Sequence, residues 1–491
     1  MKKLHSLPLR STVISILFCA ALAIAASAQG FTSLADFNGS DAALPKFNGL
    51  VQGTDGNFYG VAFDGGTANG GSVYKVTPDG TVSLVYSFCT LAQCADGFQP
   101  EGSLLLGADG NFYGTTGSGG ATNFGTVFKL TSSGTLTTLY SFCPRSGCFD
   151  GSLPIGSLVQ GFDGSFYGVT SGGGAPGRGT IFKITPDGTL TTVHTFCSLT
   201  NCVDGNGPFS LLLARDGSMY GITVAGGTQE DGTVFRFTPA GQFQTLYSFC
   251  SLTDCADGST PIGSLVVTAT GTVFGATEGG GAGLDGGTLF ELSPSGTLTT
   301  LYSFCLAETC LEGAFPETGL IQATDGRLYG GADEGGFNNR GTVFRITTAG
   351  ALIRLHSFDA SDGAFPLSPL LQGTDGNIYG TTAQGGPQNR TACPEGGPPY
   401  GCGTVFRESL GMKPFVKSVV RAGHVGDSII ILGNNLTGST GVTFNGIAAT
   451  FSIVSDTEIT ATVPTGAATG LIQVVTPSTT LASNLVFRVL P

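Results

Sequence analysis

The sequence predicts an all-β protein: a seven-bladed β-propeller with four-stranded blades, followed by a C-terminal immunoglobulin-like β-sandwich. Three observations predict this fold. One unit recurs seven times with a period of about 54 residues, which is typical of propellers and solenoids. Asp-Gly turns separate short runs of alternating apolar residues. The glycines, 80 in all, interrupt every segment that would otherwise keep the 3.6-residue apolar period of a helix.

An aromatic-Gly pair in the second strand of each unit marks the repeat. Its aromatic residues are Tyr59, Tyr113, Tyr167, Tyr220, Phe274, Tyr329 and Tyr379. In the third unit we expect strands at 155–160, 166–170, 179–184 and 189–196. Turns such as Asp163-Gly164 tolerate positive φ and therefore favour tight hairpins. Four antiparallel strands per unit are the content of one propeller blade.

The two ends of the repeat array predict a closed ring. Residues 31–37 match a fourth strand such as 298–304, whereas the seventh unit stops after its third strand. The strand at the start completes the last blade if the ring closes, and closure removes the exposed sheet edges of an open array. An open solenoid leaves this offset unexplained. We therefore predict a propeller over residues 29–410, closed by its N-terminal strand, and a separate domain over 411–491.

The N-terminus predicts export. Basic residues within the first ten positions precede the apolar run 13–26 and a small-residue cleavage site, so residues 1–28 are expected to be a signal peptide. Its removal takes away three basic and no acidic residues, which changes the net charge from −13 to −16. We expect an extracellular, cell-surface or periplasmic protein with no membrane insertion after cleavage. An acidic chain repels nucleic acid and anionic lipid, so the expected partner is an extracellular protein or polysaccharide.

Twelve cysteines after residue 28 form six local pairs. Five have the spacing C-x4-C and the sixth is wider: Cys89/Cys94, Cys143/Cys148, Cys197/Cys202, Cys250/Cys255, Cys305/Cys310 and Cys393/Cys402. In an exported chain these pairs predict disulfide bonds within single loops. A zinc site needs about four converging ligands, whereas these pairs lie a blade apart, so we predict no metal site.

Strand order places the cysteine-containing loops on one face of the propeller, together with the loops between second and third strands. We call this the loop face, and the opposite one, which carries the Asp-Gly turns, the short-turn face. Rigid scaffolds usually present binding residues on such loops. The candidate ligand-binding residues are Asp64, Glu278, Glu334 and Tyr400.

An acidic residue also recurs on the loop face in every blade, at Asp41, Asp96, Asp150, Asp204, Asp257, Glu312 and Asp362. Two interpretations fit this ring: a cation site, or a repeated turn in which the carboxylate caps its own backbone. Its presence in all seven units favours the turn.

The sequence predicts a binding or interaction protein rather than an enzyme. His194 and His356 stand where other blades have tyrosine, and His424 lies in the C-terminal domain, so we predict no catalytic residues and no cofactor. The alternative is a secreted propeller enzyme acting on polysaccharide, a glycosidase or lyase, with its carboxylates drawn from the candidate residues. Carbohydrate sites usually offer stacking aromatic residues, but the chain has no Trp.

Two resemblances to known families extend this interpretation. The block that runs from Asp109-Gly-Asn-Phe-Tyr-Gly to 139–142 resembles the GloVer-type tandem repeat of bacterial choice-of-anchor surface proteins, over residues 31–408. It implies an exported bacterial protein and supplies no catalytic residues. Residues 414–491 resemble an IPT/TIG domain through 426–436 and 442–446. This implies an Ig-like fold that serves as a spacer, docking module or protein-contact surface, and a fold alone assigns no function.

Overall fold

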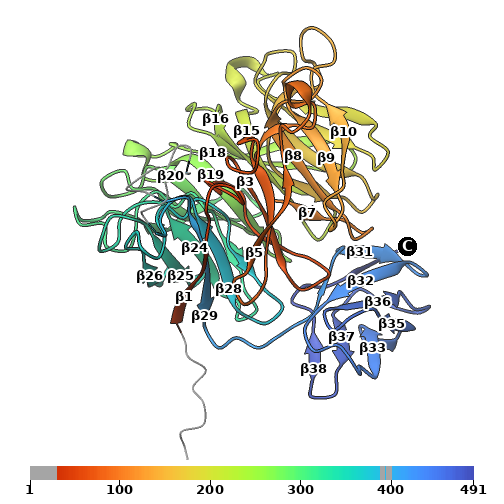
Figure 1. Cartoon of the computed structure of the whole chain (residues 1–491). Coiled ribbons are helices and arrows are strands. Elements are labelled where there is room, and N and C mark those ends of the chain that lie inside the picture. The colour runs from red at the N-terminus through yellow and green to blue at the C-terminus, as the bar shows by residue number, and fades with distance from the viewer. Residues whose placement is uncertain (1–29, 388–392, 394–400) are drawn as a thin grey trace, which may run out of the picture.

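The structure is a computed structural model that describes residues 30–387, 393 and 401–491 (Figure 1). Strands dominate it, and the only helices in these ranges are three short 3₁₀-helices: η1 (Ala92–Cys94), η2 (Thr200–Cys202) and η3 (Thr253–Cys255). No helix of the described residues is long and apolar enough to cross a membrane. The predicted all-β class is confirmed.

Seven antiparallel sheets form the blades. The first blade contains β2 (Val51–Gln52), β3 (Phe58–Ala62), β4 (Ser72–Val76) and β5 (Val82–Ser87). The second contains β6 (Phe98–Pro100) and β7 (Leu105–Leu106), which both pair with β8 (Phe112–Ser118), then β9 (Thr126–Leu130) and β10 (Leu136–Ser141). The third contains β11 (Ser152–Gln160), β12 (Phe166–Gly172), β13 (Thr180–Ile184) and β14 (Leu190–Thr195).

The remaining four blades follow the same order. The fourth contains β15 (Asn206–Leu213), β16 (Met219–Ala225), β17 (Thr233–Phe237) and β18 (Phe243–Ser248). The fifth contains β19 (Ser259–Val267), β20 (Val273–Gly279), β21 (Thr288–Leu292) and β22 (Leu298–Ser303). The sixth contains β23 (Ile321–Gln322), β24 (Leu328–Ala332), β25 (Thr342–Ile346) and β26 (Leu352–Ser357). The seventh contains β27 (Leu371–Gln372), β28 (Ile378–Thr382), β29 (Thr404–Ser409) and β1 (Gly30–Asp36).

Two contacts explain the repeated sequence D-G-x-x-Y-G: a tyrosine–aspartate hydrogen bond, found in five blades, and a glycine–ring contact, found in all seven. In the third blade the Tyr167 hydroxyl donates to Asp163 Oδ2 at 3.0 Å, which ties the second strand to its turn. A Cβ atom on Gly168 would lie 2.5 Å from Cζ of Phe182, so glycine leaves room for the ring of the third strand. Glycines at the same position face a ring in the other blades: Gly60, Gly114, Gly221, Gly275, Gly330 and Gly380. The repeat signature therefore records how strands two and three pack.

The N-terminal strand closes the ring, as predicted. β1 pairs antiparallel with β29 over its length. The Phe31 ring stacks on His356 of the sixth blade, with ring centroids 3.5 Å apart. Leu34 and the buried Phe37 belong instead to an apolar cluster shared with the first blade. β1 therefore contacts the blades on both sides of the junction.

The C-terminal domain is a small β-sandwich with its own apolar core around Ile431, Phe444 and Val474. One sheet contains β30 (Lys417–Ser418), β32 (Ser428–Leu432), β36 (Glu458–Thr462) and β35 (Phe451–Ile453). The other contains β34 (Ile447–Ala448), β33 (Gly441–Phe444), β37 (Ile472–Val475) and β38 (Thr480–Ala482). β31 (Ala422–His424) pairs with β39 (Arg488–Leu490).

This sandwich packs on the short-turn face of the propeller (Figure 1). Its side chains donate to backbone carbonyls of the first and fourth blades: Thr457 Oγ1 to Thr54 O at 2.7 Å, Arg421 Nη1 to Leu213 O at 2.8 Å and Arg488 Nη1 to Arg215 O at 3.0 Å. Leu432 packs in the apolar cluster of the first two blades. The loop face, on the other side, carries none of these contacts.

Candidate binding site

Six disulfides close within single loops, as the spacing of the cysteines predicted: Cys89–Cys94, Cys143–Cys148, Cys197–Cys202, Cys250–Cys255, Cys305–Cys310 and Cys393–Cys402. Both cysteines of every C-x4-C pair have φ between 38° and 61°, a left-handed conformation that is costly for residues other than glycine. Each short disulfide therefore holds a tight loop conformation that an open loop would relax. Disulfides of this kind indicate an oxidising, non-cytoplasmic compartment.

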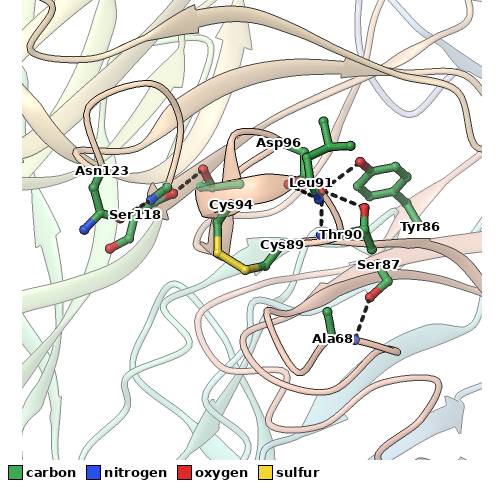
Figure 2. The surroundings of a disulfide bond; sticks show 12 residues. Ala68, Tyr86, Ser87, Cys89, Thr90, Leu91, Cys94, Asp96, Ser118 and Asn123 are labelled. Carbon is green, nitrogen blue, oxygen red and sulfur yellow. Dashed lines mark hydrogen bonds between the residues drawn. A yellow bond between two sulfur atoms is a disulfide. The ribbon is translucent and has the colours of Figure 1, made fainter.

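In four of the five C-x4-C loops the recurring acidic residue is an aspartate that accepts hydrogen bonds from the loop. Figure 2 shows Asp96 facing Tyr86, Thr90 and Leu91 beside the Cys89–Cys94 disulfide. Asp96 Oδ2 accepts the Tyr86 hydroxyl at 2.9 Å and the Thr90 N–H at 3.1 Å, and Oδ1 accepts the Leu91 N–H at 3.3 Å. Asp96, Asp204 and Asp257 are almost completely buried. This geometry matches the capped-turn interpretation of the acidic ring.

His194 and His356 are packing residues. His194 stacks on Phe243 with ring centroids 3.9 Å apart, and His356 stacks on Phe31 in the same way. His356 Nε2 also lies 2.8 Å from Asp362 Oδ2, where other blades place a tyrosine hydroxyl. Where a blade has histidine at this position, the outer strand of the following blade has a phenylalanine near its start, Phe31 or Phe243. Where a blade has tyrosine, that strand begins with a leucine, as Leu298 does after Tyr247. The histidines therefore fill space beside a larger neighbour, as the sequence suggested.

Every C-x4-C loop, taken together with the residue that follows it, presents at least one large apolar side chain to solvent. These side chains are each more than half exposed: Leu91, Phe149, Leu199, Leu252 and Leu306. We call them the tip residues. The N–H groups of Leu91, Leu199 and Leu252 are bound by the buried aspartates, so the loop backbone is fixed while the side chain stays outside. Phe337 and Leu284, from loops between second and third strands, are exposed on the same face.

The central channel opens on the loop face as a cavity of about 410 Å³. Its lining is mainly apolar, and Phe47 of the first blade meets Phe209 of the fourth edge to face, with ring centroids 5.8 Å apart. Lys46 Nζ lies 3.9 Å from the centroid of the Phe63 ring. Glu101 and Glu317 also line the cavity. A mouth of this kind offers aromatic faces with a few separated charges.

Four carboxyl groups gather on the Glu317 side of this mouth. Burial, followed by the nearby Asp333, Glu278 and Glu334, raises the pKa of Glu317 to about 8. Burial, Glu334 and Glu278 raise the pKa of Asp333 to about 7. The structure therefore brings together two predicted residues, Glu278 and Glu334, with two that the sequence interpretation missed. When the repeats are aligned, Asp333 of the sixth blade falls at the position of Glu278 in the fifth. This alignment could have identified Asp333 from the sequence.

A third candidate residue, Asp64, is not at this mouth. Asp64 is 5% exposed, and its backbone pairs with Ala43 under the loop surface, so its carboxyl group is not presented to solvent. Its position next to Gly-Gly resembles that of Glu334 in the sequence, but the first blade packs this loop more tightly. Tyr400 lies outside the described residues.

Below the mouth the channel continues into a second chamber of about 470 Å³. Val159, Leu212 and Leu265 line both spaces. On the short-turn face the chamber is bordered by segments 417–421 and 483–486 of the C-terminal domain. The channel is therefore covered at this end by the sandwich and is free of it at the loop face.

Solved structures with a similar fold have low sequence identity. A streptogramin B lyase is 14% identical, with 77% of this chain and 96% of that chain covered and a TM-score of 0.48. The extracellular domain of a putative one-component system from B. thetaiotaomicron is 13% identical, with 85% and 46% covered and a TM-score of 0.49. This chain therefore spans about half of that protein's length. A gluconolactonase from Xanthomonas campestris is 14% identical, with 63% and 84% covered and a TM-score of 0.38.

Comparison with curated proteins finds no match. Family models match two tandem segments of the propeller, residues 21–214 and 207–410, to the Gloeobacter/Verrucomicrobia repeat. An IPT/TIG model matches residues 414–489, the segment that folds as the sandwich. The two repeat matches cover most of the chain. The chain therefore belongs to the Gloeobacter/Verrucomicrobia repeat family and carries a C-terminal IPT/TIG domain.

Proposed function

We propose that this is an exported protein-binding propeller whose loop face docks onto another extracellular or cell-surface protein. The observation that carries this proposal is the set of five exposed tip residues on disulfide-closed loops. Exposed apolar patches on soluble proteins usually mark interaction sites. Rigid loops reduce the entropy cost of ordering an interface, so apolar tips held in this way suit docking.

The chemistry of the tips favours a protein over a polysaccharide. Four of the five tip residues are leucines, which fill apolar pockets but cannot stack on sugar rings as aromatic faces do. The same face carries exposed acidic side chains in blades four to six, at Glu230, Asp254, Asp285, Glu308 and Glu312. The expected partner therefore presents apolar pockets with basic residues around them, and the binding rate should fall with added salt.

Serine substitutions at Leu91, Leu199 and Leu252 test the proposal. A matched control replaces exposed apolar residues away from the loop face, Leu84, Ile353 and Val475. Each protein would capture partners from the native envelope fraction, and affinity for the recovered partner would then be measured directly. We expect at least a tenfold loss of affinity in the tip variant and little change in the control. Equal affinity of both variants would contradict the proposal.

The alternative, a polysaccharide-degrading enzyme, would draw on the carboxyl groups at the channel mouth. Glu317 and Asp333 hold protons near neutral pH, which a general acid requires. Assays with chromogenic glycosides and polysaccharides separate the two functions. Robust turnover that is lost in Glu317→Gln, Glu278→Gln or Glu334→Gln would overturn the binding proposal, whereas absence of turnover with intact partner binding supports it.

A further inference from the structure

The lower chamber of the channel holds two positive charges and no negative one. Lys417 and Arg421, both from the C-terminal domain, line it together with Gln160, Gln322 and Gln372 of the propeller. No Asp or Glu is found among the described residues that line this chamber. In an acidic chain with 21 basic and 34 acidic residues, two cations meeting without a carboxylate are unusual.

The two cations differ in how they are satisfied. Arg421 donates from Nη1 to the carbonyl oxygen of Leu213 at 2.8 Å. The ammonium group of Lys417 has no hydrogen-bond or ion-pair partner within the part of the chain that the structure describes. Burial, and then the nearby Arg421, lower the pKa of Lys417 to about 8, so at neutral pH most of its ammonium groups remain charged. A partly buried cation without a partner is unfavourable, and proteins normally pair such a group.

We propose that the chamber binds a small oxyanion between Lys417 and Arg421. A carboxylate, phosphate or sulfate group has several oxygens, and these can accept from the ammonium of Lys417 and from the remaining N–H groups of Arg421. The chamber volume of about 470 Å³ exceeds what one inorganic ion fills, so it also admits an organic acid. The site joins residues of the C-terminal domain to the propeller channel and does not depend on the loop-face proposal.

The propeller contributes the polar but uncharged part of the site. Gln160 and Gln372 are fixed by neighbouring blades: Gln160 Oε1 accepts the Ala108 N–H at 3.1 Å and Gln372 Oε1 accepts the Thr324 N–H at 2.9 Å. Leucine and valine side chains form most of the remaining lining. An apolar lining strengthens the attraction between an oxyanion and two cations, because less water screens it.

Calorimetric titration and thermal unfolding of the full-length protein, with phosphate, sulfate or succinate as the probe at constant ionic strength set by chloride, test this inference. We expect a saturable heat and a rise in the unfolding midpoint that chloride does not produce. Inorganic and organic probes distinguish a free ion from an organic acid as the preferred ligand. In Lys417→Met the affinity should fall at least tenfold, whereas Lys417→Arg should retain most of it. Lys413→Met, which replaces an exposed lysine just before β30, is the matched control.

Equal binding by Lys417→Met and the control, or the same response to chloride, would overturn the site. If Lys417→Met does not fold, crystals of the unmodified protein soaked in selenate give a second readout. A selenium peak within hydrogen-bonding distance of Lys417 Nζ supports the proposal, and a chamber without one refutes it.

Discussion

Replacing Phe31 by alanine tests whether the N-terminal strand holds the ring together in solution. Phe31 stacks on His356 and lies 5.5 Å, between ring centroids, from Phe406 of its own blade. A fully buried Phe→Ala change costs about 3–5 kcal/mol, and a stacked aromatic pair adds about 0.5–1.5 kcal/mol. Since Phe31 is only partly buried, we expect a loss of about 2 kcal/mol in the free energy of unfolding.

The chain contains its own control. Phe243 occupies the equivalent position in the fourth blade, stacks on His194 at 3.9 Å between centroids and lies 5.2 Å from Phe235. Its strand is covalently continuous with its blade, so Phe243→Ala removes the same contacts without touching the ring junction. For a propeller of this size, 2 kcal/mol corresponds to a decrease of about 2–3 °C in Tm.

Differential scanning calorimetry of both variants measures the Tm values that test ring closure. In a closed ring Phe31→Ala and Phe243→Ala lower Tm by similar amounts, and deletion of residues 29–38 exposes the edge of β29 and causes self-association or unfolding. If Phe243→Ala lowers Tm while Phe31→Ala and the deletion leave a monomeric protein with unchanged Tm, β1 does not close the ring and the reasoning is wrong.

Three further predictions follow from local geometry. The raised pKa values of Glu317 and Asp333 mean that the folded state keeps protons that the unfolded chain releases. The free energy of unfolding should therefore fall as pH rises from about 4.5 to about 8. Glu317→Gln should make this pH dependence weaker, as measured by urea unfolding midpoints across the same range. Non-reducing peptide maps should show six loop-internal disulfides, and the double replacement of Cys250 and Cys255 by serine should cost about 2 kcal/mol; inter-blade links would contradict the loop assignment. Gly168→Ala forces a Cβ against Phe182, so we expect a loss of about 1–3 kcal/mol in denaturant titrations, and an unchanged midpoint would show that the ring can move aside.

The repeat made most of the fold predictable, because each recurring residue has a contact in its own blade. The aromatic-Gly pair, the turn aspartate and the cysteine spacing all act within about 20 residues of each other. Ring closure was predictable for a related reason: residues 31–37 repeat the pattern of an outer strand. The ends of strands were less predictable. β11 begins at Ser152, three residues before the expected start, because Ser152 already pairs with Gly172.

Contacts between distant segments were not predictable from the sequence. Glu317 joins Glu278 and Asp333 only because side chains of neighbouring blades converge on the channel mouth. The sandwich docks in part through hydrogen bonds from Arg421 and Arg488 to backbone carbonyls, and an acceptor on the backbone cannot be recognised from the residue pattern. The lower chamber could not be predicted either, because it is bordered by segments of both domains that lie far apart in the sequence.

In a propeller with seven similar blades, the residues that inform about function are those that the packing common to all blades does not explain. The buried aspartates and the aromatic-Gly pairs are explained by the blade itself, so their repetition carries no information about a ligand. The exposed leucines at the loop tips repeat without any packing role. In every blade but the fifth, the residue after the repeated proline lines the channel and is different each time: Lys46, Glu101, Ile155, Phe209, Glu317 and Leu367. Apolar side chains that are exposed in several blades suit contact with a broad protein surface. Channel residues that differ between blades suit a single small ligand. The loop face should therefore be tested with proteins and the channel with small molecules.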